Sequence, residues 1–336
     1  MARIGMIGAG SWGTALAAHL ARCGHQVKIW SIMKDETDMI NNTHQQSVKL
    51  PGVVLDDSVT ASTDLEEVMR DKDMLVLAVP SAFVRSTARS MAKYCRYGQL
   101  IVSVAKGIEE DTLLTMTEVI KQEIPHCEAA VLCGPTHAEE VGIGLPTAIV
   151  AGAARREVAE YIQSVFMGKT FRVYTSPDML GMQVGAALKN VIALAAGCSD
   201  GLGCGDNTKA ALITRGIAEI SQIGTLMGGK PATFSGLTGI GDLIVTCASM
   251  HSRNRRAGIL IGKGMTADEA MKEVKQVVEG VFSAKAALQL ADKYGVEAPI
   301  IRAVNRVLFG NEAPGMAVED LMLREGKIES DDHAWE

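Results

Sequence analysis

The chain has 336 residues, a length that favours two domains over a single core. A net charge of -6 and an aromatic content of 4% argue against a nucleic-acid-binding surface and an anionic membrane surface. The seven cysteines are scattered without a C-x-x-C pair, as is typical of a reducing compartment. The N-terminus has no signal-peptide anatomy, and no apolar run approaches the ~20 residues of a membrane helix. We therefore expect a soluble, cytosolic protein without membrane insertion.

The first half alternates short apolar runs with helical segments. The runs are rich in β-branched residues and predict strands over 3–8, 26–30, 74–79, 100–105, 129–134, 147–152 and 171–176. Helices are expected between several of them, over 14–22, 83–94 and 112–121. Strands that alternate with helices predict an α/β fold with a doubly wound parallel sheet of the Rossmann type and right-handed crossovers.

The second half is predicted to be all-helical. Ser176, Pro177 and Asp178 look like the N-cap, first residue and first-turn acid of a long helix that Gly197 would end. Further helices are expected over 208–228, 255–262, 267–274, 280–294 and 299–309. These patterns predict a dinucleotide-binding domain over 1–176, a helical substrate-binding domain over 177–328 and a frayed tail over 329–336.

A glycine-rich turn follows the first predicted strand. Gly8-Ala9-Gly10-Ser11-Trp12-Gly13 fits G-x-G-x-x-G and opens the helix that begins at Ser11. Glycines at these positions permit a tight turn and the close approach of a pyrophosphate, which then lies on the amides of the helix N-terminus. The turn predicts a dinucleotide site.

The second predicted strand ends in Trp30-Ser31-Ile32-Met33-Lys34. An acid at this tip would bind the ribose 2′-hydroxyl of NAD, whereas an arginine would accommodate the 2′-phosphate of NADP. Neither stands there, and Lys34 is the only nearby cation. The choice between NAD and NADP stays open at this point.

The stretch 183–197, QVGAALKNVIALAAG, holds a single charged residue, Lys189. A lysine can lay its stem along apolar surface and extend its ammonium group into water. Alternatively, the ammonium group faces an internal cleft, where desolvation makes it a tunable acid or base. Gly185, Ala186 and Ala193 lie one turn away on the same helix face, so we expect open space beside the ammonium group.

Two further groups of residues are candidates for ligand binding. Lys106 and the segment with Gly134, Thr136 and Ala138 follow strands, where ligands bind in open α/β sheets. For Lys106, a solvated loop position is the alternative. A metal site built on His137, Glu139 and Glu140 is not expected, because no H-E-x-x-H helix and no cysteine pair supports it.

In the helical half, Asp242 lies among Gly and Ile residues and is followed by Thr246. Next comes a polar and basic cluster formed by Ser252, Arg253, Asn254, Arg255 and Arg256. Such a cluster in an acidic protein suits a phosphate, which planar guanidinium groups bind with two parallel hydrogen bonds. A plain solvated surface is the alternative.

Eight segments form a specific set in collinear order: GAGSWGTALA, AKGIE, CGPTHAEEV, LKNVIALAAG, GLGCGDNTKAALITRG, GLTGIGDL, HSRN and VVEGV. With them the chain closely resembles NAD(P)-dependent glycerol-3-phosphate dehydrogenases of the bacterial type, from about Ile4 to Val318. The resemblance implies a cytosolic homodimer that interconverts dihydroxyacetone phosphate and glycerol 3-phosphate with NAD or NADP, for glycerophospholipid synthesis. The family's usual Arg or His after the strand-end tryptophan falls at Ile32 here, which argues against a strong NADP preference.

The resemblance also implies residue roles. The cofactor would be bound by Gly8, Gly10, Ser11, Trp12, Gly13, Phe83, Lys106, Ala138, Arg253, Val277 and Glu279. The substrate would be bound by Lys106, Gly134, Thr136, Lys189, Asn190, Asp242, Thr246, Ser252, Arg253 and Asn254. Lys189, Lys106 and Asp242 would be catalytic, with Lys189 as proton donor or acceptor; burial and Lys106 would lower its pKa and Asp242 would raise it.

The sequence leaves two other functions as alternatives. A lysine-using dehydrogenase of the β-hydroxyacid or phosphogluconate kind would share the two-domain plan, but the cluster at 252–254 without sugar-acid motifs disfavours it. A catalytically silent nicotinamide sensor would bind the cofactor without turnover.

Overall fold

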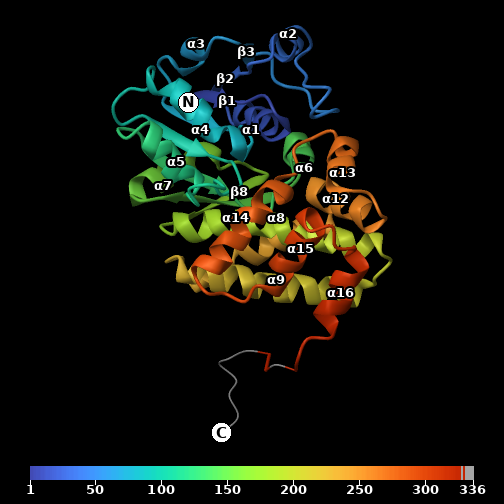
Figure 1. Ribbon diagram of the computed structural model, residues 1–336. Helices are drawn as coiled ribbons and strands as arrows, with labels where there is room; N and C mark the ends of the chain where they lie inside the picture. The colour runs from blue at the N-terminus through green and yellow to red at the C-terminus, as the bar shows by residue number, and fades with distance from the viewer. Residues whose placement is uncertain (327, 330–336) are drawn as a thin grey trace.

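A computed structural model describes residues 1–326 and 328–329 and places a sheet-containing half above a helical half (Figure 1). The sheet has eight strands in the order β3-β2-β1-β4-β5-β6-β7-β8. Its strands are β1 (Arg3–Ile7), β2 (Gln26–Trp30), β3 (Thr60–Ser62), β4 (Met74–Leu77), β5 (Leu100–Ser103), β6 (Glu128–Cys133), β7 (Thr147–Ala153) and β8 (Phe171–Ser176). The seven predicted strands are confirmed; only the three-residue β3 was missed, because it lacks an apolar run.

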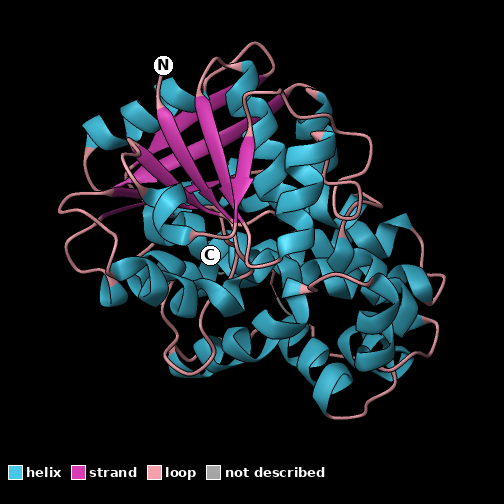
Figure 2. Cartoon of the chain, turned by 90° about the horizontal axis from the view of Figure 1, so that it is seen from above, coloured by secondary structure: helices cyan, strands magenta, loops and turns pink. Residues whose placement is uncertain are grey.

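Both faces of the sheet are buried, because side chains alternate between two apolar layers. Ile4 and Met6 of β1 belong to the layer with α1 (Ser11–Arg22) and α7 (Arg156–Phe166). Ile7 belongs to the opposite layer, with α3 (Leu65–Met69), α4 (Val84–Ala92) and α5 (Met116–Glu123). Figure 2 shows helices on both sides of the strands. The predicted doubly wound fold is therefore confirmed.

Two strands run against the predicted direction. The expectation of a wholly parallel sheet is wrong at β7 and β8. β7 pairs antiparallel with β6 and β8 pairs parallel with β7, so both run opposite to the other six strands. The connection contains only α6 (Ala138–Ile143), and a six-residue helix spans ~9 Å, whereas a six-residue strand spans ~20 Å. The chain therefore turns at the carboxyl edge instead of crossing back along the sheet.

The helical half is built around α8 (Met179–Gly201). Its N-cap is Asp178, whose side chain accepts a hydrogen bond from the Gly181 amide, so the predicted capping by Ser176 is wrong. Gly197 does not end the helix. A Cβ atom at Gly197 would lie 2.2 Å from the Arg255 carbonyl oxygen, so this glycine serves a close helix–helix contact.

Other helices complete the two halves. In the first half these are α2 (Lys34–Thr43) and the 3₁₀ turn η1 (Ser81–Phe83). In the second they are α9 (Asp206–Leu226), α10 (Pro231–Phe234), the π-helical turn η2 (Leu237–Gly241), α11 (Asp242–Ala248), α12 (Arg253–Gly262), α13 (Ala267–Val274), α14 (Glu279–Lys293), α15 (Pro299–Phe309) and α16 (Pro314–Met322). The predicted helices of the second half are confirmed within a few residues; the short α10, α11 and α16 were missed. Residues 330–336 of the predicted tail lie outside the described residues.

By length and composition alone α8 could cross a membrane, since its 23 residues include a sufficiently apolar 18-residue window. The expectation that no apolar run approaches such a length therefore needs correction. However, 83% of that window is buried inside the protein. Helices α9, α11, α12 and α14 pack around it. It serves as the central core helix of the helical half.

We predict that Gly258→Ala destabilises the protein, although alanine is the better helix former. A Cβ atom at Gly258 of α12 would lie 2.2 Å from the Leu194 carbonyl oxygen of α8, so the two helices must separate. Overpacking of this kind costs about 1–3 kcal/mol of unfolding free energy, measurable by urea denaturation.

Gly315→Ala is the matched control, because Gly315 lies exposed in α16. Apart from the backbone of α16 itself, no atom described in residues 1–326 and 328–329 lies within 4 Å of the place that a Cβ atom would occupy there. It should be neutral or slightly stabilising. Equal stability of the two variants would show that α12 can shift away from α8 at no cost.

Candidate active site

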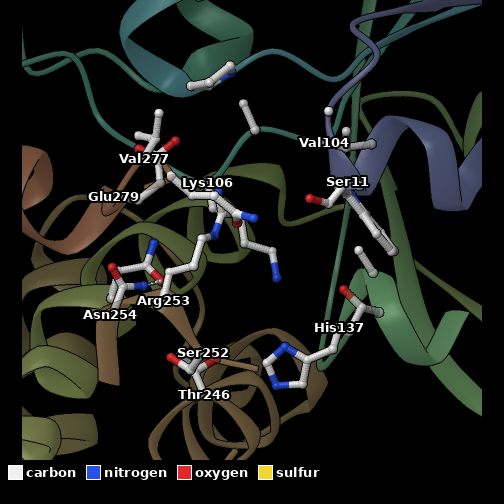
Figure 3. Close-up of a pocket in the computed structure, with 18 of the residues that line it drawn as sticks. Ser11, Val104, Lys106, His137, Thr246, Ser252, Arg253, Asn254, Val277 and Glu279 are labelled. Atoms are coloured by element: carbon white, nitrogen blue, oxygen red, sulfur yellow. Dashed lines mark hydrogen bonds between the residues drawn. The ribbon is translucent and has the colours of Figure 1, made fainter. Parts of the chain in front are cut away.

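A cleft of about 200 Å³ lies where the carboxyl edge of the sheet meets the helical half (Figure 3). The sheet half contributes Ser11, Lys106 and His137; the helical half contributes Thr246, Ser252, Arg253, Asn254, Val277 and Glu279. Ligands of open α/β folds bind at this edge, next to the point where the strand order reverses. Here the order reverses between β1 and β4.

The glycine-rich turn fits a dinucleotide. Gly8 has φ +123°, which a side chain would strain, and a Cβ atom at Gly13 would lie 2.2 Å from the Gly8 carbonyl oxygen. At Gly10, by contrast, apart from its neighbours in the chain, no atom of the described residues lies within 4 Å of the Cβ position, so a ligand can approach the backbone. Gly10, Ser11 and Trp12 line the cleft, and the buried Trp12 Nε1 has no hydrogen-bond partner among the described residues. The open backbone at Gly10 suits the close approach of a pyrophosphate group to the amides at the start of α1.

Lys189 does not extend into bulk water. Its residue is only 4% exposed, and its ammonium group donates a 2.5 Å hydrogen bond to Thr246 Oγ1 and forms a 2.8 Å ion pair with Asp242 Oδ1. The interpretation as a surface lysine is therefore wrong. Burial lowers the pKa of Lys189 to about 8, although Asp242 opposes this shift. An amine with such a pKa can exchange a proton near neutral pH.

Asp242 neutralises two ammonium groups at once. Lys106 Nζ lies 2.7 Å from Asp242 Oδ2 and also donates a 3.1 Å hydrogen bond to the Gly134 carbonyl oxygen. Burial alone would raise the pKa of Asp242, but Lys106 and Lys189 hold that pKa below its ordinary value. The carboxylate is thus charged and fully buried.

Small residues on α8 make this contact possible. A Cβ atom at Gly185 would lie 2.8 Å from the Thr238 carbonyl oxygen of η2. The space expected beside Lys189 is therefore filled on that side by the backbone of η2. Because η2 leads directly into α11, its close approach brings Asp242 and Thr246 to the lysine.

The residues of the polar cluster that begins at Ser252 have different roles. Ser252 is the N-cap of α12 and accepts a hydrogen bond from the Arg255 amide, while Arg255 pairs with Asp200 at 2.7 Å. Arg253 lines the cleft and has no ion-pair partner among the described residues. Burial lowers the pKa of its guanidinium group, which nonetheless stays charged at neutral pH. A charged guanidinium group is thus available to an anion.

Two further contacts link helices around the cleft. Asn254 Nδ2 donates to Asn190 Oδ1 at 2.9 Å, and Asn254 Oδ1 accepts from the Gly280 amide at 2.8 Å. Glu279 accepts hydrogen bonds from the Ser81 amide at 3.1 Å and the Ser81 hydroxyl at 2.5 Å. The second contact connects η1 of the sheet half with α14 of the helical half.

Most of the predicted site residues line this one cleft: Gly10, Ser11, Trp12, Lys106, Thr136, Ala138, Lys189, Asn190, Thr246, Ser252, Arg253, Asn254, Val277 and Glu279. Gly8, Gly13, Gly134 and Asp242 are not among the lining residues, but Gly134 and Asp242 contact Lys106, and Gly8 and Gly13 flank the turn that contains Gly10. Phe83 is not among the lining residues and is 55% exposed at the end of η1.

Sequence reasoning did not select His137, Glu139, His251 or Gln276, which also line the cleft. His137 Nε2 lies 3.4 Å from the Val245 carbonyl oxygen of α11, and its ring lies 5.7 Å from that of His251. The adjacency of these histidines to Thr136 and Ser252 in the sequence was an available signal. Across residues 1–326 and 328–329, no group of three or more metal-ligating side chains was found.

The tip of β2 also differs from expectation. Glu36, near the start of α2, accepts a 2.6 Å hydrogen bond from Ser31 Oγ and forms an ion pair with Lys49. The tip therefore carries an acid after all, brought there by the turn after β2. Lys34 is not the only cation near this tip, because Lys49 lies there too. Lys34 itself pairs with Asp38.

A dinucleotide-binding sheet, a helical half and a buried lysine–aspartate cluster in the cleft between them define a nicotinamide-dependent oxidoreductase. The family model for the N-terminus of NAD-dependent glycerol-3-phosphate dehydrogenase matches residues 3–159. The family model for its C-terminus matches residues 178–319. The chain belongs to this family.

Named relatives agree with that assignment. The glycerol-3-phosphate dehydrogenase [NAD(P)+] of Agathobacter rectalis is 62% identical over 335 residues, with 100% of both chains covered. That of Fusobacterium nucleatum is 56% identical, with 98% of this chain and 99% of the relative covered. The crystal structure of the glycerol-3-phosphate dehydrogenase from Coxiella burnetii has a TM-score of 0.93 at 35% identity and covers 96% of this chain and 99% of that one. The chain is thus an enzyme, an NAD(P)-dependent oxidoreductase.

We predict that Asp242→Asn destabilises the fold by about 3–5 kcal/mol, because it leaves the buried Lys189 and the half-buried Lys106 ammonium groups without their counter-charge. Urea denaturation would measure the loss. Asp292→Asn is the control, since Asp292 forms a 2.6 Å pair with Arg302 while 57% exposed, and surface pairs contribute ~0–1 kcal/mol. A loss below about 1 kcal/mol at Asp242 would mean that the lysines discharge or reach water instead.

Proposed function

We propose that this chain catalyses the reversible reduction of dihydroxyacetone phosphate to glycerol 3-phosphate with NADH or NADPH. The observation that carries this proposal is a buried, Asp242-paired Lys189 in the same cleft as the unpaired Arg253 guanidinium group. The first suits a ketone that gains a proton, and the second suits a phosphate.

In this proposal the bound nicotinamide supplies the hydride. Gly10, Ser11 and Trp12 would hold its pyrophosphate group at the amides that start α1, and Val277 and Glu279 line the site from the helical half. We further propose that residues 1–176 form the cofactor-binding domain and residues 177–328 the substrate-binding domain.

Lys189 is the proposed proton donor. As the C2 carbon of the ketone is reduced, negative charge grows on its oxygen, and an adjacent ammonium group stabilises that charge before it transfers its proton. Asp242 and Thr246 orient the amine, and Lys106 adds a second positive charge. In the reverse direction neutral Lys189 accepts the proton from the alcohol.

The phosphate end of the substrate is assigned to the start of α12. Arg253 provides the charge, and Ser252 and Asn254 provide neighbouring polar groups at a helix N-terminus. The proposal also includes a cytoplasmic homodimer that supplies glycerophospholipid synthesis, as in the family that the motifs resemble.

The two other functions make different predictions. A dehydrogenase for β-hydroxyacids or phosphogluconate would leave reduced nicotinamide unchanged with dihydroxyacetone phosphate but act on its own acid. A silent sensor would bind the nicotinamide and turn over none of these substrates.

The test is the fall in nicotinamide absorbance when dihydroxyacetone phosphate is added. Dihydroxyacetone, which lacks the phosphate, should be a poor substrate. Arg253→Ala should lower kcat/KM for the phosphorylated ketone by roughly ten- to hundred-fold, because a charge-assisted hydrogen bond contributes ~1.5–3 kcal/mol. Equal turnover of both ketones by the wild type would contradict the phosphate assignment.

Lys189→Met should separate catalysis from folding. Methionine keeps the length and apolar character of the stem, so α8 should still pack. Loss of the proton donor and of a charge facing the oxyanion should lower kcat by about three orders of magnitude. Melting temperature and cofactor affinity should stay near normal, because the glycine-rich turn lies elsewhere.

The pH dependence provides the second readout for Lys189. Below about pH 8 the amine is protonated and can serve as the acid, so ketone reduction should slow as the pH rises through that value. Alcohol oxidation needs the neutral amine and should show the opposite slope.

A folded Lys189→Met variant that keeps more than about a tenth of wild-type turnover would contradict the mechanism.

A further inference from the structure

The acid at the tip of β2 is held in place on two sides. Ser31 Oγ donates to Glu36 Oε2 at 2.6 Å, and Lys49 Nζ pairs with Glu36 Oε1. Ser31 is buried, and the Glu36 side chain is only 15% exposed. The carboxylate is therefore fixed and poorly screened by water.

This Ser31–Glu36–Lys49 cluster is tied to the glycine-rich turn. The Gly8 amide donates to the Trp30 carbonyl oxygen at 2.9 Å, which aligns the ends of β1 and β2. Gln46 Nε2 donates to the Ala9 carbonyl oxygen at 3.2 Å, and Ser11 Oγ donates to the Lys49 carbonyl oxygen at 2.7 Å. In dinucleotide-binding folds the adenosine ribose lies between this turn and the tip of the second strand.

We infer that Glu36, positioned by Ser31 and Lys49, makes this enzyme favour NADH over NADPH. The inference rests on the proposed cofactor site. A ribose 2′-hydroxyl can donate a hydrogen bond to the carboxylate. A 2′-phosphate carries about two negative charges and meets like charge at the same place.

Lys49 offsets this repulsion only in part, and no other cation described near the tip of β2 is free to do so. Lys49 is already paired, so a 2′-phosphate would have to draw it away and leave Glu36 without its partner. Lys34 forms a 2.5 Å pair with Asp38 one turn along the exposed side of α2. Ile32, 78% exposed at the tip itself, offers no charge.

The test compares dissociation constants of NADH and NADPH by titration calorimetry, which does not depend on turnover. The wild type should bind NADH at least about ten-fold more tightly. Glu36→Gln keeps the size of the side chain and its bond from Ser31 but removes the charge and frees Lys49. It should shift the ratio of the two constants toward NADPH by about ten-fold or more.

Asp38→Asn is the matched control, because it removes one carboxylate from the same helix. The ratio should change by less than about two-fold, since Asp38 is not part of the cluster. If Lys34 were instead the phosphate ligand, this variant would free it and strengthen NADPH binding. Ser31→Ala provides an independent variant: without the orienting hydroxyl, discrimination should weaken although the charge remains.

Equal or tighter binding of NADPH by the wild type would overturn the inference. An unchanged ratio in a folded Glu36→Gln variant would do the same, as would an equal effect of Asp38→Asn. Should Glu36→Gln not fold, the ratio in Ser31→Ala decides. Failure of the proposed reaction would show separately, as nicotinamide binding without turnover of dihydroxyacetone phosphate.

Discussion

The arrangement of the cleft depends on one buried carboxylate, Asp242, which balances two ammonium groups from different parts of the chain. Lys106 follows β5 of the sheet half, whereas Lys189 lies in the middle of α8. Two desolvated cations would otherwise repel each other and add to the cost of burying charge. Asp242 offsets that cost and joins the two halves at the centre of the proposed reaction site. It also opposes the fall in the pKa of Lys189, which still stays far below that of a free lysine.

Close backbone contacts make this charge cluster possible. Gly185 lets η2 approach α8, and Gly197 and Gly258 let α12 lie against the same helix. These contacts bring Asp242, Thr246 and Arg253 to one side of α8, although they come from separate segments. A helix with larger side chains at these positions would hold the same functional groups too far apart. The small residues on α8 thus allow close helix packing, and this packing brings the functional groups together.

The charged groups in and near the cleft differ in whether they are paired. The Lys106–Asp242–Lys189 cluster is internally balanced, which suits a group that must change its protonation state. Arg253 has no ion-pair partner among the described residues and suits a permanently charged ligand. Outside the lining of the cleft, at the tip of β2, the Ser31–Glu36–Lys49 cluster holds a fixed carboxylate. An acidic protein can therefore bind anions at chosen points without a positively charged surface.

The sequence by itself determined the alternation of strands and helices, the glycine-rich turn and most residues of the cleft, because these depend on local periodicity, local backbone freedom and recognisable motifs. Tertiary structure alone decided the direction of β7 and β8, the length of α8 beyond Gly197 and the pairing of Lys189 with Asp242. It also brought Glu36 to the tip of β2, although the residues directly after Trp30 contain no acid. Each of these features depends on contacts between segments far apart in the chain or on the course of a turn. A pattern read along the sequence does not contain the distances that such contacts require.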